Sequence, residues 1–471
     1  MAVPCLVALA YHEPQGWYFF WTAVISAAAG FVIARREMSN KTYHLKEGCA
    51  ATALSWLLIS AVSALPMHLC GAIPTYTDAL FEMISGYTTT GSSILTDVES
   101  LPQCALFARS FSHWIGGMGV LVFMLAIVPS FGGSKMNIMK AESPGPVVGK
   151  LVPKVKETAR ILYIIYIIMT VIQFIFLLAG RLPFLEALEI TFGTAGTGGF
   201  GVKNSSCGDY SPYVQWVVAI FMMLFGVNFN AYYLILTGKL KEALKMEEVR
   251  GYFIMIGAAC ALIMINMAGT ADSAADFVRN TFFQVSSLET STGYATVDFD
   301  LWPDFSKAVL IFVMFIGACA GSTGGGIKVS RLIILIKSML REIGYYLHPK
   351  SVRSIKSDGK TVDEATVSSI NAYLVTFLSI FCVSMFLVSL EGRDLMTNFS
   401  AVLTAFNNMG PGFADVGPTK NFSQMSVLSK YVLMFDMLAG RLEIYPMLMI
   451  FHPVLWKETF EKRGMRKRHS R

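Results

Sequence analysis

The stretch Gly86-Tyr87-Thr88-Thr89-Thr90-Gly91-Ser92 follows an apolar segment and precedes a polar turn. Three related stretches occur farther along the chain: Gly193-Thr194-Ala195-Gly196-Thr197-Gly198-Gly199, Leu288-Glu289-Thr290-Ser291-Thr292-Gly293-Tyr294 and Phe406-Asn407-Asn408-Met409-Gly410-Pro411-Gly412. Successive copies lie roughly a hundred residues apart, and repetition at a regular spacing indicates a repeat architecture. A single such stretch favours an ordinary turn, whereas four copies between long apolar segments favour one shared structural role.

The four copies align on a glycine that follows a threonine in three of them. The aligned pairs are Thr90-Gly91, Thr197-Gly198, Thr292-Gly293 and Met409-Gly410. Glycine allows backbone conformations that other residues resist, so the carbonyl groups of these stretches can turn toward one axis. Four such strands form rings of carbonyl and threonine oxygens that replace the water shell of a monovalent cation. We therefore predict an ion-binding filter made of Thr89, Thr90, Gly91, Gly196, Thr197, Gly198, Ser291, Thr292, Gly293, Asn408, Met409 and Gly410.

The composition indicates an all-α polytopic membrane protein. Of the 471 residues, 54% are hydrophobic and only 15% are charged, whereas soluble domains carry about 25% charged residues. Several apolar runs reach the roughly 20 residues that span a bilayer. The basic residues behind the net charge of +6 lie between these runs, as orientation signals do, and do not indicate nucleic-acid binding. The eight cysteines lack metal-ligand spacing, so we expect buried apolar roles for them and no covalent cofactor.

The order helix, half-length helix, glycine stretch and return helix occurs four times, which predicts four pore repeats around one pseudo-fourfold axis. The half-length helices are expected at 76–85, 184–192, 274–286 and 395–405, and the return helices at 107–129, 213–236, 305–340 and 427–451. Glu82, Glu189 and Gln284 lie at one offset before their aligned glycines. The C-terminal ends of the half-length helices are expected to point at the pore, where their negative dipole ends favour cations.

These repeats give the predicted domain boundaries. The domains are N-terminal helices (1–46), repeat 1 (47–134), a basic loop with repeat 2 (135–249), repeat 3 (250–360), repeat 4 (361–456) and a basic cytoplasmic tail (457–471). Residues 1–10 are apolar but too short to span a bilayer. They resemble the end of a first helix whose beginning is absent.

The distribution of charge predicts the orientation of the chain. Lysine and arginine cluster at 35–46, 135–160, 239–250, 337–360 and 457–471. By the positive-inside rule these clusters are cytoplasmic, so the four glycine stretches open to the outside. Acidic residues follow each stretch instead, and such residues are expected to raise the local cation concentration. They are Asp97, Glu99, Asp209, Asp298, Asp300, Asp304 and Asp415.

The return segment of the third repeat is interrupted by Gly321-Ser322-Thr323-Gly324-Gly325-Gly326, with Lys328 two residues beyond. Consecutive glycines cost about 1 kcal/mol each in a helix, and broken backbone at membrane depth usually lines a cavity. We expect a movable loop across the pore. The alternative is a flexible kink or a packing site for a neighbouring helix.

The return helix of the fourth repeat carries charged residues among apolar ones, and charges inside a membrane face the bundle interior or a partner. Arg441 is the notable one. Facing the pore, it repels cations or binds carbonyl groups of the glycine-rich loop. The alternative is a structural pair with Asp436 or Glu443, of which Glu443 is the weaker candidate because residues two apart do not share a helix face.

Taken together, these motifs resemble the membrane subunit of Trk-type bacterial potassium uptake systems (TrkH/TrkG), within the superfamily that includes KtrB and the plant HKT transporters. The resemblance spans nearly the whole chain from residue 48. The matching stretches are Thr88–Gly91, Trp114–Gly119, Ala195–Phe200, Thr292–Tyr294, Gly321–Lys328, Asn408–Gly412 and Gly440–Ile444.

The resemblance implies a multi-pass protein of the bacterial inner membrane, with four linked repeats around one potassium filter and K⁺ as the transported ion. It implies that the Gly321–Gly326 loop and Arg441 form an intramembrane gate. It further implies a homodimer and a cytoplasmic nucleotide-binding regulatory subunit similar to TrkA. Glycine at all four filter positions is the family's potassium pattern, and serine at the first is its sodium pattern, so Gly91 favours potassium.

Potassium uptake, without covalent chemistry, is therefore the predicted function. A sodium/potassium or proton-coupled cation symporter stays open as an alternative, since the sequence does not distinguish passive from coupled flow. A polytopic membrane enzyme needs acids, histidines or nucleophiles that converge at one membrane face, and no such set is visible. A purely structural membrane scaffold does not account for four filter-like repeats.

Overall fold

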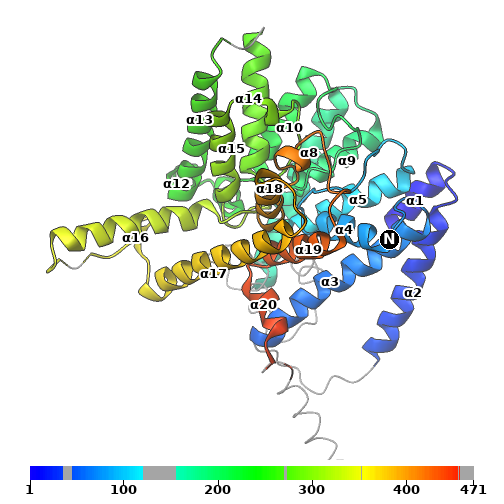
Figure 1. The fold of residues 1–471 in the computed structure, drawn as a ribbon, viewed down its shortest axis with the longest axis horizontal. Helices are drawn as coiled ribbons and strands as arrows, with labels where there is room; N and C mark the ends of the chain where they lie inside the picture. Colours follow the sequence, from blue (N-terminus) through cyan, green and yellow to red (C-terminus); the bar gives the residue numbers. More distant parts are fainter. Residues whose placement is uncertain (36–44, 120–154, 270–272, 352, 454–455, 457–471) are drawn as a thin grey trace, which may run out of the picture.

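The computed structural model describes residues 1–35, 45–119, 155–269, 273–351, 353–453 and 456. This part of the chain is almost entirely helical (Figure 1). The strands within it are β1 (Lys356–Ser357) and β2 (Lys360–Thr361), which pair antiparallel in a small hairpin. The all-α prediction is confirmed.

The helices of each repeat occur in the predicted order. Repeat 1 contains α3 (Leu45–Leu69), α4 (Tyr76–Tyr87) and α5 (Gln103–Gly117), and repeat 2 contains α8 (Val155–Ala179), α9 (Phe184–Ala195), α10 (Pro212–Phe225) and α11 (Phe229–Leu236). Repeat 3 contains α13 (Glu247–Asn266), α14 (Ala274–Glu289), α15 (Asp304–Ile316) and α16 (Val329–Leu347). Repeat 4 contains α17 (Glu364–Ser389), α18 (Leu395–Phe406), α19 (Val427–Arg441) and α20 (Tyr445–Phe451). Two further α-helices lie before repeat 1, α1 (Ala2–Ala10) and α2 (Gly16–Ala34), and α12 (Leu240–Lys245) joins repeats 2 and 3.

In three of the four repeats the short second helix begins at a side-chain cap. The side chains of Thr75, Ser273 and Asp394 accept hydrogen bonds from the backbone N–H groups of the first turns of α4, α14 and α18. In α9 the same position is Pro183. Such caps satisfy N–H groups that a helix leaves unpaired at its start. Because α4, α9 and α18 have 12 residues each and α14 has 16, each is too short to span a bilayer.

The return helices of repeats 2 and 4 differ from the prediction, because each is broken where a continuous helix was expected. The α10–α11 pair bends by 91° at residues 226–228, and α19 ends at Arg441, three residues before α20. The predicted break between α15 and α16 is confirmed. In repeat 1, α5 ends at Gly117, and the predicted continuation to 129 lies outside the described residues, as do the basic segments 135–154 and 457–471. A glycine lies at or beside each break, which is the signal the sequence offered.

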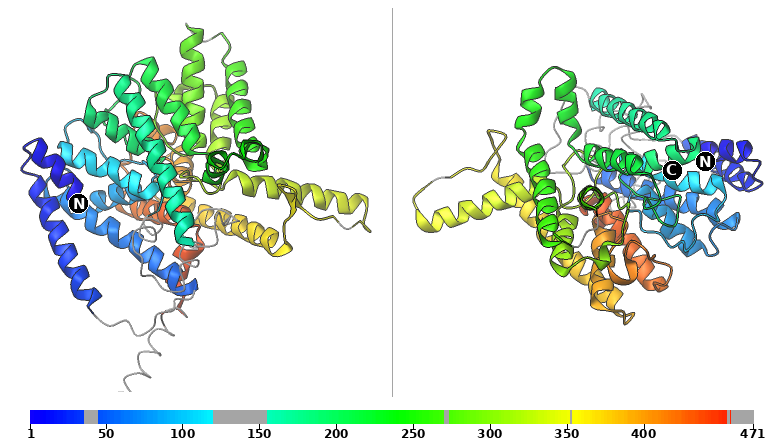
Figure 2. Two further views of the ribbon diagram at one scale, coloured as in Figure 1. Left: turned by 180° about the vertical axis from the view of Figure 1, so that it is seen from behind. Right: turned by 90° about the horizontal axis from the view of Figure 1, so that it is seen from above.

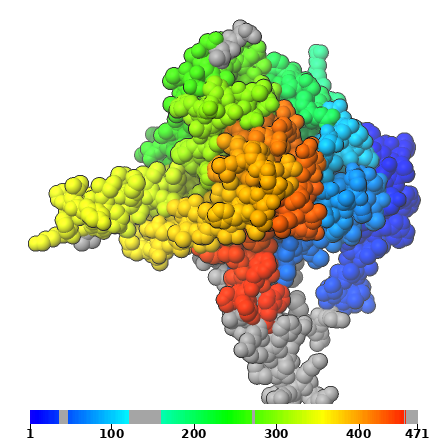
Figure 3. Space-filling view, viewed as in Figure 1, coloured from blue at the N-terminus to red at the C-terminus, as the bar shows by residue number. Residues whose placement is uncertain are grey.

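The figures show how the repeats are arranged. The short helices α4 and α18 lie near the middle of the molecule, α14 rises from there to its upper edge, and α16 projects from one flank (Figures 1 and 2). The space-filling view shows the same projecting arm (Figure 3). The α1–α2 hairpin lies on the opposite flank, where the Glu13 carboxylate accepts hydrogen bonds from the backbone N–H groups of Gln103 (2.7 Å) and Cys104 (3.0 Å). This contact fixes the hairpin to the start of α5.

The long helices have the length and composition of membrane spans. Five described helices meet this test (α2, α3, α8, α13 and α17), and the bent α10–α11 pair is a sixth if it counts as one span. Their outward faces carry many exposed apolar side chains, such as Ile254 on α13 and Phe386 on α17. Exposed apolar faces of this extent suit a lipid environment.

Two glycines at helix breaks touch the backbone of a short helix directly. A Cβ atom added at Gly116 of α5 would lie 1.9 Å from the carbonyl oxygen of Tyr87, and one added at Gly440 of α19 would lie 1.9 Å from that of Phe406. No side chain fits at such a distance. The contacts place the return helices of repeats 1 and 4 against the C-terminal ends of α4 and α18.

We predict that Gly440→Ala destabilises the protein by about 1–3 kcal/mol, because the added methyl group overpacks a fixed backbone contact. Thermal unfolding in detergent measures this effect. Gly257→Ala on α13 is the matched control, because a Cβ atom there meets no atom within 4 Å and alanine favours the helix. Equal stability of the two variants would contradict the close contact.

Candidate functional site

The four glycine stretches leave their short helices in the same way. In each, a backbone N–H donates to the carbonyl five residues earlier at 2.8 Å, which closes the last turn of the helix. The donor and acceptor pairs are Thr90 to Ser85, Gly198 to Gly193, Thr292 to Ser287 and Met409 to Thr404. These bonds make Thr90, Gly198, Thr292 and Met409 structurally equivalent.

The equivalence corrects the predicted alignment of the second repeat by one residue. The glycine after each donor is Gly91, Gly199, Gly293 or Gly410, and the first three have φ values of 81°, 76° and 87°. The residue before each donor also has a positive φ, between 52° and 58°: Thr89, Thr197, Ser291 and Asn408. Gly199, which the prediction omitted, is therefore the counterpart of Gly91. Gly198 takes the place of Thr90, and Gly196 lies one residue before the equivalent stretch.

The misleading signals were Thr197 and Glu189. A Thr-Gly pair and an acid at the expected offset both favoured Gly198, but Ile190 is the true counterpart of Glu82. The helix start gives the better register, since Pro183 precedes Gly199 by the same number of residues as Thr75 precedes Gly91.

The four stretches form a closed ring. A Cβ atom added at Gly91 would lie 1.9 Å from the carbonyl oxygen of Gly198 and 3.6 Å from the Cα of Gly410. One added at Gly199 would lie 1.9 Å from the oxygen of Thr292. One added at Gly293 would lie 2.9 Å from the nitrogen of Gly410. Each repeat thus touches the next, and the fourth touches the first.

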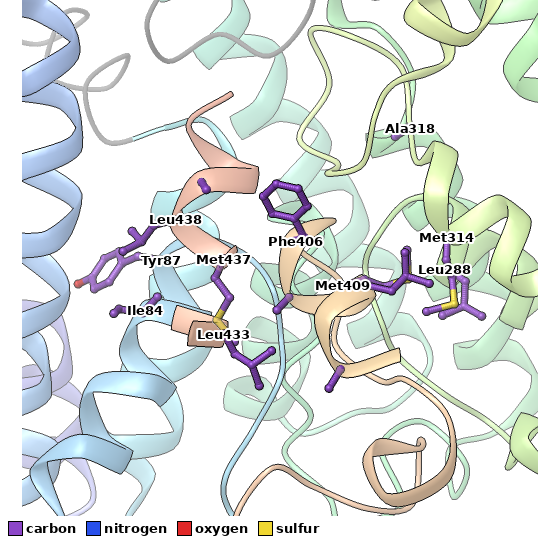
Figure 4. Close-up of a cluster of buried hydrophobic side chains, with 14 of the residues drawn as sticks. Ile84, Tyr87, Leu288, Met314, Ala318, Phe406, Met409, Leu433, Met437 and Leu438 are labelled. Atoms are coloured by element: carbon purple, nitrogen blue, oxygen red, sulfur yellow. The ribbon is translucent and has the colours of Figure 1, made fainter. Parts of the chain in front are cut away.

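The side chains of the glycine stretches are buried, and their hydrogen bonds and packing hold the ring backbone in place. The hydroxyl pairs Thr88–Thr90 and Thr290–Thr292 are each 2.8 Å apart. The Asn408 side chain donates to the Thr90 hydroxyl (3.1 Å) and to the Met437 carbonyl (2.8 Å). The Met409 side chain is fully buried in the hydrophobic core that also contains Phe406, Leu288 and Met314 (Figure 4).

A buried ion pair braces the chain after the first two glycine stretches. Glu82 of α4 accepts from Arg109 of α5 at 2.8 Å and also from the Ser93 hydroxyl (2.9 Å) and the Ile94 N–H (3.0 Å). The Arg109 guanidinium lies 4.2 Å from the centre of the Phe200 ring, and Phe200 follows Gly199. Removal of one partner from such a pair leaves an uncompensated buried charge, so the pair holds both stretches in place.

A cavity of about 200 Å³ opens directly onto the ring. Its lining includes Gly91, Gly199, Gly293 and Gly410, together with Lys203, Lys420 and Arg109. Among the described residues that line it there is no aspartate or glutamate. The acids that follow the stretches in sequence are therefore not lining residues of this cavity, and their expected effect on the local cation concentration stays a prediction.

The acids of these loops are instead used to hold turns together. The Asp97 carboxylate accepts from the Asn204 side chain (2.9 Å), which lowers the pKa of Asp97, and from the Glu99 N–H (3.1 Å). The Asp300 carboxylate accepts from the Ala414 N–H (3.2 Å). Asp415 pairs with Lys420 at 3.0 Å. Short acidic side chains commonly accept hydrogen bonds from nearby backbone in turns. The acids held in this way are absent from the described lining of the cavity.

The glycine-rich loop, residues 317–328, lies against the opposite side of the ring. The Ser291 hydroxyl accepts a hydrogen bond from the Gly325 N–H at 2.5 Å. A Cβ atom added at Gly325 would lie 2.1 Å from the carbonyl oxygen of Asn407, and one at Gly324 would lie 2.9 Å from that of Thr290. The loop therefore packs directly under the C-terminal ends of α14 and α18.

Neighbouring elements hold the loop from the side. The Gly321 carbonyl accepts from the Phe229 N–H (3.0 Å), and the Cys319 N–H donates to the Gly226 carbonyl (3.1 Å). The Glu248 carboxylate accepts from the Ala320 N–H at 2.6 Å. Within the loop, the Lys328 ammonium donates to the carbonyl groups of Gly324 and Gly325. These bonds occupy backbone groups that the helix break would otherwise leave unpaired.

Arg441 links the loop to the opposite repeat. Its guanidinium donates to the Thr323 carbonyl (2.8 Å) in the loop and to the carbonyls of Gly116 and Gly117 at the end of α5. Arg441 thus donates to a carbonyl of the loop, which is one of the arrangements that the sequence left open. Asp436 accepts from Ser384 at 2.7 Å, and Glu443 pairs with Arg331.

The arrangement defines a class of protein: a helical membrane protein with four re-entrant repeats around a central axis. Within the described residues, no three His, Cys, Asp or Glu side chains are placed to bind a metal ion.

Comparison with known proteins agrees with this class. Residues 17–462 match the family described as TrkH, a cation transport protein. The chain is 35% identical over 468 residues to the Trk system potassium uptake protein TrkH of Salmonella typhimurium, covering 97% of this chain and 96% of that protein. It is 32% identical to TrkG of Escherichia coli, covering 97% and 95%. The crystal structure of the potassium transporter TrkH from Vibrio parahaemolyticus superposes with a TM-score of 0.85 at 29% identity, covering 97% of this chain and 95% of that one.

The chain belongs to the TrkH family of cation transport proteins. It is a multi-pass protein of the bacterial inner membrane and a transport protein, not an enzyme. The resemblance read from the sequence is thereby confirmed.

Proposed function

We propose that the chain takes up K⁺ across the cytoplasmic membrane through the ring of four glycine stretches. The single observation that carries the proposal is the closed ring of backbone contacts from Gly91 through Gly199 and Gly293 to Gly410. Backbone carbonyls arranged around an axis replace the hydration shell of a monovalent cation. Transport of this kind needs no covalent cofactor.

The choice of potassium is supported by two further features. The relatives named above are potassium uptake proteins, and all four ring positions in this chain are glycine. In the corrected register, the oxygen-bearing residues are Thr89, Thr90, Thr197, Gly198, Ser291, Thr292, Asn408 and Met409, followed by the ring glycines. Because the Met409 side chain is buried in the core, Met409 would contribute its carbonyl alone.

We place the ring toward the outside and the glycine-rich loop toward the cytoplasm. The positive-inside rule supports this orientation, since the basic clusters at 239–250 and 337–360 lie at chain segments remote from the ring. Ions would enter through the cavity that opens onto the ring and meet the loop below it.

The loop and Arg441 act as the gate in this proposal. Gly324 and Gly325 lie within contact distance of the ends of two short helices, and Arg441 ties the loop to α5 across the axis. A positive charge at this position also repels a cation that leaves the filter. Opening therefore requires that Arg441 release at least one of its two sets of carbonyls.

The uptake proposal is tested by Rb⁺ or K⁺ uptake at low external K⁺ in cells that lack their own potassium systems. We predict that the chain restores uptake and that Gly91→Ser and Gly199→Ser each lose at least about tenfold of the preference for K⁺ over Na⁺. A side chain at either position meets a neighbouring carbonyl oxygen at 1.9 Å.

Gly417→Ala is the matched control for the ring variants. It lines the same cavity, but its φ is −64° and its nearest contact is 3.2 Å away. Unchanged selectivity in both serine variants, with normal amounts in the membrane, would remove these glycines from the filter.

The gate is tested with Arg441→Gln. We predict a rise in K⁺ leak of about tenfold or more, since the bridge between the loop and α5 contributes charge-assisted hydrogen bonds of about 1.5–3 kcal/mol each. Efflux from K⁺-loaded proteoliposomes measures the leak. Arg393→Gln, which alters an arginine paired with Glu391 away from the loop, serves as the control. A leak no greater than that of the control would assign Arg441 a structural role.

We further propose that the chain forms a homodimer and works with a cytoplasmic nucleotide-binding regulatory subunit. The projecting helix α16 supports the dimer, because one of its faces exposes a stripe of apolar side chains: Ile336, Met339, Leu340, Ile343 and Leu347. We predict that Leu340→Asp with Ile343→Asp shifts the detergent-solubilised protein from dimer to monomer in light scattering. A monomeric unaltered protein would refute the dimer, and uptake that is independent of any nucleotide-binding partner would refute the regulatory subunit.

A further inference from the structure

The cavity above the ring presents basic side chains to an entering cation. Lys203 and Lys420 both line it, and their side chains are 35% and 53% exposed. Arg109 also lines it, but its charge is neutralised by the buried Glu82 carboxylate at 2.8 Å. The Arg109 side chain is also buried, so the two lysines are the basic residues of the lining that are substantially exposed to solvent and to ions.

The acids that pair with these lysines are not part of the lining. Glu186 lies 3.7 Å from the Lys203 ammonium, and Asp415 lies 3.0 Å from that of Lys420. Neither carboxylate belongs to the residues that line the cavity. The ammonium-bearing residues therefore belong to the lining of the cavity, whereas the residues that carry their partner carboxylates do not.

We propose that Lys203 and Lys420 discriminate between cations by valence, admitting monovalent ions and keeping divalent and polyvalent cations from occupying the mouth of the filter. The proposal rests on the proposed potassium uptake. The physical reason is that the energy of an ion in a given potential is proportional to its charge. Two fixed positive charges therefore raise the energy of Mg²⁺ twice as much as that of K⁺, and they affect K⁺ and Na⁺ equally.

In this proposal the ring and the lysines select for different properties of an ion. The ring of carbonyls distinguishes ions of the same charge by how well its oxygens replace the water shell that each ion loses. It binds cations through concentrated negative dipoles, and divalent ions are attracted to such dipoles more strongly than monovalent ones. Positive side chains at the entrance offset that preference before an ion loses its water.

The size of the effect follows from Coulomb's law. A unit charge roughly 8 Å from an ion in screened aqueous surroundings changes the occupancy of a monovalent ion by about twofold. The same charge changes the occupancy of a divalent ion by about fourfold and that of a trivalent ion by about eightfold. The dependence on valence distinguishes a charge effect from a change of shape.

The test is Rb⁺ uptake at constant ionic strength, inhibited by external Mg²⁺ or by hexaamminecobalt(III), which is trivalent and keeps its ligand shell. For Lys203→Gln or Lys420→Gln we expect the inhibitory concentration of Mg²⁺ to fall about fourfold and that of the cobalt complex about eightfold. The apparent KM for Rb⁺ is expected to fall about twofold, and the K⁺ over Na⁺ preference to stay unchanged. The double variant is expected to combine the shifts.

Two further variants control for shape and for general surface charge. Lys420→Arg keeps the positive charge and is expected to retain the inhibition of the unaltered chain. Lys307→Gln removes a lysine from the first turn of α15, paired with Asp300 at 3.5 Å but absent from the lining, and is expected to shift inhibition by less than about twofold.

The possible failures are distinguishable. Absence of Rb⁺ uptake by the unaltered chain, with and without its regulatory subunit, would overturn the proposed function and this role with it. Normal uptake with unchanged Mg²⁺ inhibition in the double variant would overturn the lysine role alone. Equal shifts for Mg²⁺ and the trivalent complex, or a Lys420→Arg variant that behaves like Lys420→Gln, would also overturn it, because neither result follows from charge.

Discussion

The structure depends on one constraint, which is that non-helical backbone must be held in place within a membrane. Four stretches leave their short helices with positive φ values and meet in a ring, where Gly91 approaches the Gly198 carbonyl too closely for any side chain. Water is scarce at that depth, so each exposed N–H or carbonyl requires a protein partner, an ion or a cavity. Much of the surrounding structure supplies those partners, from the helix-end bonds to the Glu82–Arg109 brace.

The same constraint explains the hydrogen bonds of the broken return helices and of the glycine-rich loop below the ring. Every return helix of repeats 2 to 4 breaks near the axis, and each break frees backbone groups that would be costly in lipid. The loop after α15 uses them to bind its neighbours, through Ser291, Glu248 and the Arg441 guanidinium. A continuous helix would have no free carbonyls for Arg441 to bind. The breaks are therefore what allows one loop to lie across the axis while its polar groups stay satisfied.

The sequence predicted the repeats, the short helices and the interrupted third repeat, because glycine and apolar length are local signals. It did not predict features that depend on tertiary contacts between residues far apart in the chain. The second register failed by one residue since Thr197 imitates Thr90 in sequence but takes the backbone position of Thr89. The bend at residues 226–228 was missed because one glycine is compatible with a helix. The sequence also could not show that Asp97 and Asp300 accept hydrogen bonds from backbone N–H groups, because these bonds depend on how the loops fold.

The four quadrants of the ring are encoded separately in one chain. In a pore built from four identical subunits, any substitution enters the ring four times, so a change tolerable once becomes prohibitive. Here the position of Thr90 and Thr292 is occupied by Gly198 in the second quadrant and by Met409 in the fourth, where the side chain is buried in the core. Among the described residues, the long glycine-rich loop belongs to the third repeat. Because each quadrant has its own stretch of sequence, one repeat can carry a loop across the axis while the other three keep their part of the ring.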